Sequence, residues 1–179
     1  MQWELRWMRW ADGWWSSSVL DHVLPWLTYL GSHYAFILFI ILSWIITKQR
    51  KVLRYLILLY AIQSAVIYSL KFLIQRQRPF LFLDMTSKLS KGPGEILDPS
   101  FPSAHADFSF MMATLLATWF PRYWIIFFVV AVFVSWTRIY LGVHYPTDVI
   151  VGAILGYGIT RVYIFFCLSR RDERKSNNI

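Results

Sequence analysis

The chain of 179 residues has the length of one domain, yet hydrophobic residues make up 57% of it and charged residues only 16%. Soluble domains carry about 25% charged residues, so this composition argues against a soluble enzyme, a disordered chain or a DNA-binding module and favours a protein embedded in lipid. A net charge of +8 in a membrane chain indicates cytoplasmic loops and anionic lipid or phosphate ligands, and no nucleic-acid partner is expected.

The N-terminal segment, residues 1–20, is predicted to be an amphipathic helix that lies in the headgroup region of the bilayer. Four tryptophans recur there at steps of four, three and four residues, which sets them on one face of a helix; they are Trp3, Trp7, Trp10 and Trp14. Tryptophan is enriched at membrane interfaces, so this face is expected to anchor the helix. No continuous apolar stretch follows the basic residues of the segment, which argues against a signal peptide.

Residues 21–168 are expected to form an all-α transmembrane domain of about five spans. A helix needs about 20 apolar residues to cross a hydrocarbon core of about 30 Å. Five stretches approach this length, and they are residues 25–47 with a break at 31–33, then 55–74, 106–120, 123–140 and 149–168. Residues 169–179 are predicted to be a basic tail.

Three polar clusters stand at the ends of these spans. They are Lys71-x6-Arg78-Pro79, Pro102-Ser103-Ala104-His105 and Arg138-x5-His144-x3-Asp148. Successive spans cross the membrane in opposite directions, so the end of the second span, the start of the third and the loop after the fourth lie on one side. We therefore expect the three clusters to converge in one pocket at the membrane interface.

The cationic members of these clusters predict a site for a tetrahedral oxyanion. Arg78 and Arg138 offer planar forks of donors that match phosphate oxygens, and Lys71 offers a point charge. Ser103 adds a hydroxyl at the start of the third span, where unpaired backbone N–H groups and the positive end of the helix dipole also favour an anion.

The remaining ionisable groups predict nucleophilic and acid–base chemistry. If the chain is helical there, His144 and Asp148 lie on one helical face, and a carboxylate on one ring nitrogen leaves the other free to attack. His105, near the start of a helix, is suited to protonate a leaving oxygen. The four histidines do not form a convincing zinc cluster, and no carboxylate cluster accompanies the cations, so no metal and no cofactor are expected.

Together, the three clusters resemble the signature of the type 2 phosphatidic acid phosphatase superfamily, which reads Lys-x6-Arg-Pro, Pro-Ser-Gly-His and Ser-Arg-x5-His-x3-Asp. The resemblance implies a helical membrane core and a phosphohistidine mechanism. It implies that His144 attacks phosphorus, that Asp148 orients His144, and that His105 protonates the leaving group and later activates water. It also implies that the phosphate is held by Lys71, Arg78, Ser103 and Arg138.

Two positions depart from this signature. Ala104 stands where the family has glycine, and Thr137 stands where it has serine. Alanine can form the same turn unless the backbone requires a positive φ at that position. Neither change removes a catalytic group, so we expect an active site with a slightly altered phosphate turn around Ala104.

Other residues have two interpretations. Asp107 is predicted either to support a site cation or to be an interfacial carboxylate, because a buried charge near the membrane is unfavourable. Arg76 and Lys88 are interpreted as solvated loop charges, with contact to a lipid headgroup as the alternative. The motif Gly152-x3-Gly156 is predicted to let two helices pack closely.

The function that follows is a metal-independent lipid phosphatase, because a site at the membrane interface suits a substrate whose tails stay in the bilayer. Small members of the resembling family are mostly bacterial, which predicts a bacterial inner membrane. Undecaprenyl diphosphate and lipid A 1-phosphate are expected equally as substrates, with phosphatidylglycerophosphate behind them. The alternatives are a haloperoxidase that holds vanadate and a lipid-phosphate binding or transport protein with an idle site. The oligomeric state is left open.

The distribution of basic residues predicts the orientation of the chain in the membrane. Nine lysines and arginines are expected on the side away from the site and eight on the site side, and the ligand explains three of those eight. The remaining nine against five predict that the C-terminal tail is cytoplasmic and that the active site faces the periplasm or the cell exterior.

Overall fold

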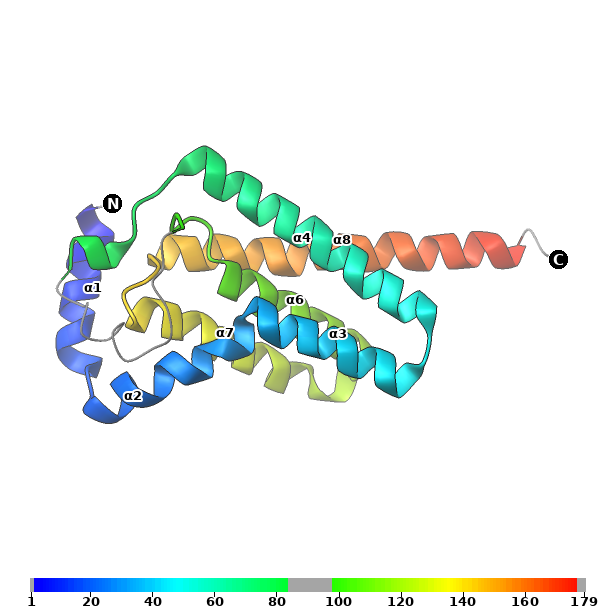
Figure 1. Ribbon diagram of the computed structural model, residues 1–179, viewed down its shortest axis with the longest axis horizontal. Coiled ribbons are helices and arrows are strands. Elements are labelled where there is room, and N and C mark those ends of the chain that lie inside the picture. Colours follow the sequence, from blue (N-terminus) through cyan, green and yellow to red (C-terminus); the bar gives the residue numbers. More distant parts are fainter. Residues whose placement is uncertain (1, 84–97, 177–179) are drawn as a thin grey trace.

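The computed structural model describes residues 2–83 and 98–176, and every regular element in these two stretches is a helix (Figure 1). The longer helices are α1 (Gln2–Trp15), α2 (Ser18–Leu27), α3 (His33–Thr47), α4 (Arg50–Ile74), α6 (Ala104–Trp119), α7 (Trp124–Tyr140) and α8 (Pro146–Ser176). Three short 3-10 helices accompany them, and these are η1 (Thr28–Gly31), η2 (Pro79–Leu81) and η3 (Pro121–Tyr123). The predicted all-α class is confirmed.

Length and hydropathy identify the elements that can cross a membrane. Three segments of the described chain qualify alone, and they are Arg50–Leu81, Pro121–Tyr140 and Pro146–Cys167. A fourth candidate is the pair Ser18–Gly31 and His33–Thr47, which is bent by 49°. With 16 residues, α6 is about 24 Å long and does not reach across a hydrocarbon core of about 30 Å by itself. The chain is a multi-pass membrane protein, and the number of five spans stays a prediction.

The break in the first expected span has a packing cause. Ser32 follows η1 and caps α3, where its Oγ accepts a hydrogen bond from Ala35 N at 3.3 Å. Gly31 packs against the start of α6, since a Cβ at this position would collide with Ser109 Oγ and His105 O. The chain therefore bends at the interruption that the sequence shows, and the bend packs against the first turns of α6.

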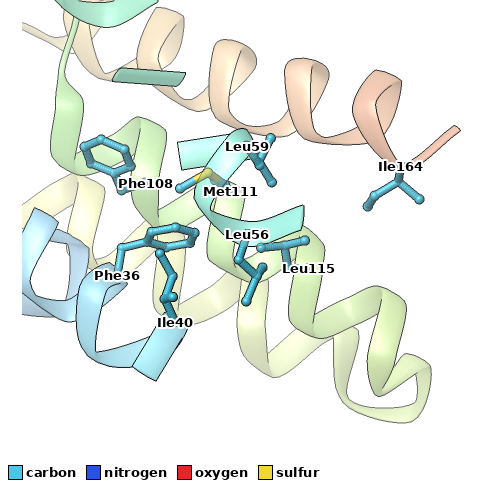
Figure 2. Close-up of a cluster of buried hydrophobic side chains, with 8 residues drawn as sticks. All are labelled: Phe36, Ile40, Leu56, Leu59, Phe108, Met111, Leu115 and Ile164. Carbon is cyan, nitrogen blue, oxygen red and sulfur yellow. The ribbon is translucent and has the colours of Figure 1, made fainter. Parts of the chain in front are cut away.

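The centre of the bundle is α6, which packs along α7 and α8 and also contacts α3 (Figure 1). Its buried face joins residues from three other helices in one apolar core, and Figure 2 shows Phe36, Ile40, Leu56, Leu59, Phe108, Met111, Leu115 and Ile164. The outward faces of the helices are also apolar, as at Phe72 and Ile46, which are 76% and 80% exposed. An apolar exterior of this kind suits a surface solvated by lipid tails.

Two glycines let α8 approach α6 closely. A Cβ at Gly152 would collide with Ser103 O, and a Cβ at Gly156 would collide with Asp107 O. The predicted role of these glycines in helix packing is therefore confirmed. Because Ser103 precedes α6 directly, the contact also fixes the start of α6 against the first turns of α8.

The helix α1 crosses the end of the bundle where α7 ends and α8 begins (Figure 1). The predicted tryptophan face is exposed, and its members Trp3, Trp7, Trp10 and Trp14 are 55%, 38%, 63% and 79% accessible. The other face is buried at positions i, i+4 and i+7, which are Glu4, Met8 and Ala11. The helix thus has two faces with different roles, and the inward face carries a buried carboxylate.

At the opposite end, α8 continues past the rest of the bundle (Figure 1). Its 31 residues give it a length of about 46 Å. The segment boundaries predicted after residues 20 and 168 fall inside α2 and α8. The division of the chain at these two positions stays a prediction.

Candidate active site

The three polar clusters meet at the end of the bundle that α1 crosses. Arg78 joins the first cluster to the third, because its Nη1 donates to Val143 O at 2.8 Å and lies 3.3 Å from His144 Nε2. Ser103 joins the second cluster to the third, because its backbone N–H donates to Asp148 O at 3.0 Å. Residues separated by up to 77 positions in sequence, from Lys71 to Asp148, therefore converge as the alternation of spans predicts.

Local backbone geometry positions His144. Its N–H donates to Arg138 O at 3.3 Å, as does that of the preceding residue at 3.1 Å. The turn between them uses Gly142 at φ 68°, a left-handed conformation that glycine adopts without strain. Pro146 then starts α8, a position that suits its fixed φ. His144 thus stands just before the helix, so the condition for a common helical face with Asp148 is not met.

Asp148 nevertheless lies close to His144. Its Oδ2 is 3.6 Å from His144 Nδ1, which is beyond hydrogen-bond length, and this Nδ1 has no hydrogen-bond partner. Oδ2 instead accepts a hydrogen bond from Tyr145 N at 2.9 Å and so caps the start of α8. Oδ1 accepts a hydrogen bond from Arg76 Nη1 at 2.5 Å. Both oxygens of the carboxylate are therefore held in place beside the imidazole.

The surroundings of His144 keep its ring neutral. Burial lowers the pKa of His144 well below its usual range, and the positive charges of Arg78, Arg138 and Lys71 lower it further. A guanidinium only donates, so Arg78 assigns the acceptor role to Nε2 and leaves the ring proton on Nδ1, toward Asp148. Nε2 is therefore the unprotonated nitrogen, and its lone pair, which accepts from Arg78 here, is the one that can attack phosphorus.

The two cations of the first cluster share a carboxylate that the sequence did not reveal. Asp98 lies 2.9 Å from Lys71 Nζ through Oδ2 and 2.6 Å from Arg78 Nη2 through Oδ1. Arg78 Nε also donates to the backbone oxygen of Asp98 at 2.8 Å, and Lys71 donates to Pro99 O. Burial raises the pKa of Asp98, but Arg78 and Lys71 outweigh this effect and hold the pKa below its usual range.

Arg138 supplies a third buried cation. Only 5% of the residue is exposed, and its Nη1 donates to Thr28 Oγ1 at 2.9 Å. Its Nε has no hydrogen-bond partner. A buried guanidinium with an unsatisfied donor has a strong preference for an anionic ligand.

The second cluster contributes the start of α6. Ser103 is fully buried, and its Oγ accepts from Ala106 N at 3.4 Å as the helix cap, while His105 is half-buried in the first turn. Asp107 is fully buried, and neither of its carboxylate oxygens has a hydrogen-bond partner. Asp107 therefore makes no hydrogen bond to a site cation, and its place at the membrane interface stays a prediction. Within residues 2–83 and 98–167, no three His, Cys, Asp or Glu side chains group as a metal site.

Comparison with known proteins settles the family. Residues 52–171, more than half of the chain and all three clusters, match the pattern of the PAP2 superfamily. The chain belongs to the PAP2 superfamily. The family predicted from the three clusters is thus confirmed.

Members and relatives of the PAP2 superfamily agree with the chain in sequence and in fold. An undecaprenyl-diphosphatase of Sulfolobus acidocaldarius is 33% identical over 144 residues, which cover 80% of this chain and 68% of the relative. A lipid A 1-phosphatase of Rhizobium etli is 36% identical over 88 residues, which cover 49% of this chain and 38% of the relative. The crystal structure of a transmembrane PAP2 type phosphatidylglycerolphosphate phosphatase from Bacillus subtilis has a TM-score of 0.74 at 24% identity, covering 94% of this chain and 86% of that one.

The two residues that depart from the PAP2 signature, Ala104 and Thr137, fit into their own helices. Ala104 is the first residue of α6, and among the described non-glycine residues only Lys48 and Gln75 have a positive φ. Alanine therefore fits where the signature has glycine. Thr137 uses its Oγ1 to donate to Val134 O at 2.6 Å, within its own helix.

Three residues that pair with the predicted clusters were not expected from the sequence. Arg76 was interpreted as a loop charge, yet it forms ion pairs with Glu4 and Asp148, both at 2.5 Å. The i, i+4, i+7 pattern of Glu4 with Met8 and Ala11 would have indicated an inward face of the first helix. No sequence pattern marks Asp98. The possible headgroup contact of Lys88 lies outside the described residues.

Proposed function

We propose that the chain hydrolyses a phosphate or diphosphate from a lipid headgroup at the membrane interface through a phosphohistidine intermediate on His144. The observation that carries this proposal is the geometry of His144, whose Nε2 lies 3.3 Å from Arg78 Nη1 and whose Nδ1 lies 3.6 Å from Asp148 Oδ2. Membership of the PAP2 superfamily and relatives named as lipid phosphatases support the same class of reaction. The chain is thus best described as a membrane lipid phosphatase.

The reaction proceeds in two steps. His144 Nε2 forms a bond to phosphorus while the bond to the lipid-side oxygen breaks, and that oxygen takes a proton from His105. Water then attacks the phosphohistidine and gives a proton to His105, and the bond between nitrogen and phosphorus breaks to release phosphate. Asp148 Oδ2 faces Nδ1 of His144 at 3.6 Å, and its negative charge stabilises the ring when the ring becomes positive during attack.

Stabilisation of the transition state falls to the buried cations. Lys71, Arg78 and Arg138 surround His144 closely enough to lower its pKa, so a phosphoryl group bonded to that ring is within their field. Once the phosphate has replaced the carboxylate of Asp98 on Lys71 and Arg78, these cations bind the extra negative charge of a five-coordinate phosphorus more strongly than the charge of the substrate. Ser103 supports this set by capping α6, whose N-terminal dipole also favours an anion.

The first substrate we propose is undecaprenyl diphosphate. The relative that matches 80% of the chain carries this substrate in its name, whereas the lipid A 1-phosphatase matches only 49%. Lipid A 1-phosphate and phosphatidylglycerophosphate follow as second and third candidates. All three present a phosphate at the interface while their tails remain in the bilayer, which suits a site at one end of an apolar bundle (Figure 1).

We further propose that the protein resides in a bacterial inner membrane with the site facing outward. The turn between α3 and α4 and the C-terminal part of α8 lie at the end of the bundle away from α1 (Figure 1). That end carries the larger share of basic residues that no ligand explains, which supports a cytoplasmic location for it.

Purified full-length protein in detergent would test the proposal through release of inorganic phosphate from the three lipids. We expect the highest kcat/KM for undecaprenyl diphosphate and no release by His144→Ala. Retained release in His144→Ala would overturn the mechanism. Binding of all three lipids without release from any of them would instead identify a binding protein.

A further inference from the structure

The N-terminal helix α1 contributes a buried carboxylate to the end of the bundle that holds the site. Only 2% of Glu4 is exposed, although it lies in a helix whose tryptophan face is open. Its Oε1 accepts hydrogen bonds from Thr147 N at 3.2 Å and from Thr147 Oγ1 at 2.7 Å, and its Oε2 accepts one from Arg76 Nη2 at 2.5 Å. Burial raises the pKa of Glu4, but these hydrogen bonds outweigh it and lower the pKa, so Glu4 stays charged.

Arg76 connects Glu4 to Asp148. Its Nη2 faces Glu4, while its Nη1 donates to Asp148 Oδ1 at 2.5 Å and to Thr147 Oγ1 at 2.8 Å. The guanidinium carbon lies 3.8 Å from the ring centroid of Tyr145, so the planar group also rests on an aromatic face. This set of contacts fixes the planar guanidinium of Arg76. A lysine at this position has a single nitrogen and cannot make all of these contacts at once.

These contacts determine which oxygen of Asp148 faces the histidine. Arg76 holds Oδ1, and the backbone N–H of Tyr145 holds Oδ2, which is the oxygen 3.6 Å from His144 Nδ1. We propose that Glu4 and Arg76 are positioning residues for the Asp148–His144 pair, so that α1 is a working part of the active site. The inference rests on the proposed role of His144 as the nucleophile.

A purely structural role for this network makes a different prediction. If Glu4 and Arg76 only attach α1 to the bundle, their loss lowers thermal stability and leaves the turnover of the folded fraction unchanged. If they position Asp148, loss of either lowers kcat while KM changes little, because the phosphate itself is bound by other side chains. The two cases separate in a kinetic experiment on folded protein.

The experiment measures phosphate release from undecaprenyl diphosphate by purified full-length variants, with thermal unfolding recorded for each. We expect Arg76→Lys to lower kcat about 10- to 100-fold and Glu4→Gln to lower it less, both with KM within about threefold of the wild type. Arg9→Gln is the matched control, since Arg9 lies on the same helix but is exposed and donates only to Phe82 O among the described residues. Its kcat should equal that of the wild type.

A second background isolates the path through Asp148. In protein that already carries Asp148→Asn, adding Arg76→Lys should lower kcat by a further factor of less than about three. The effects of two substitutions on kcat do not add when the two residues act as a unit. Equal losses in the wild-type and Asp148→Asn backgrounds, or an effect on KM alone, would overturn the inference. If Arg76→Lys does not fold, Glu4→Gln is assayed in the same two backgrounds with the same criteria. Absence of phosphate release by the wild type would instead refute the proposed function.

Discussion

Asp98 Oδ1 lies 2.6 Å from Arg78 Nη2, and the other oxygen of the same carboxylate lies 2.9 Å from Lys71 Nζ. The two oxygens of a carboxylate meet these cations much as two oxygens of a phosphate would. The side chain of Asp98 is 45% exposed, so a ligand can reach the pair from the surface. If Lys71 and Arg78 bind phosphate as proposed, Asp98 competes with the substrate for them.

Replacement of Asp98 with asparagine should strengthen anion binding. The change removes the competing charge but keeps the size of the side chain, so inhibition by inorganic phosphate should require about 3- to 10-fold less phosphate. The lowered pKa of Asp98 keeps it charged well below neutrality, so the effect should be the same from about pH 6 to 8. Asp21→Asn is the control, because Asp21 pairs with the Tyr140 hydroxyl. Weaker inhibition in Asp98→Asn would mean that Asp98 orders the cations instead.

The loss of turnover caused by substitution of His144, His105 and Asp148 should follow the chemical role of each residue. His144→Ala should abolish turnover, because no other group forms the covalent intermediate. His105→Ala should lower kcat about 10²- to 10⁴-fold, the usual contribution of a general acid. Asp148→Asn should cost less than either, since Asp148 orients the ring and its oxygens are held by groups other than His144. Single-turnover kinetics with trapping of phosphorylated protein would check the order.

The same assay identifies an incorrect assignment. Phosphorylated protein should accumulate in a variant whose second step is slowed, and it should be absent from His144→Ala. Trapped phosphoprotein in His144→Ala, or a larger loss in Asp148→Asn than in His105→Ala, would require different roles for these residues.

The convergence of the three clusters was predictable because it depends on local sequence and on the number of spans between the clusters. Helix periodicity and the length of apolar stretches set the helices, and each cluster stands where a helix ends. The alternating direction of successive helices then brings the end of α4, the start of α6 and the turn before α8 to one side. The interruption at Gly31 was also visible in the sequence, and the structure adds that the chain bends there by 49°.

The pairing of charges within the site was not predictable, because it depends on packing between segments far apart in the chain. Arg76 lies 72 residues from both Glu4 and Asp148, and nothing local distinguishes it from a solvated loop arginine. Asp98 pairs with Lys71 and Arg78 because its segment lies against the end of α4 in the folded chain. His144 does not share a helical face with Asp148 because α8 begins at Pro146, two residues after His144.

Helix packing next to the site should be sensitive to one methyl group. Gly156→Ala introduces a Cβ that collides with Asp107 O, so it should destabilise the protein by about 1–3 kcal/mol. Gly158→Ala is the matched control, because a Cβ there meets nothing within 4 Å and alanine favours a helix. Thermal unfolding in detergent should show a lower midpoint for the first variant alone. Equal midpoints for both would mean that α6 and α8 are free to move apart.

Cysteine labelling should establish the orientation of the chain. Ser16 is exposed in the turn after α1, the helix that crosses the end of the bundle holding the site, and Gln49 is exposed in the turn between α3 and α4; each is replaced by cysteine. In a background that carries Cys167→Ser, an impermeant thiol reagent should label position 16 in intact cells and position 49 only after permeabilisation. The excess of unexplained basic residues at the end that holds Gln49 is the reason for this expectation. The reverse pattern would put the active site in the cytoplasm.

Catalysis should not depend on a divalent metal. Many phosphatases use metal ions to offset the charge of the transition state, but here Lys71, Arg78 and Arg138 supply positive charge around His144. Phosphate release should therefore continue in excess chelator. Vanadate adopts a five-coordinate geometry readily, so it should bond to His144 and inhibit in competition with the lipid, and His144→Ala should lose vanadate binding measured by equilibrium dialysis. Loss of all activity in chelator, restored only by added Mg²⁺ or Zn²⁺, would show that the three cations do not suffice.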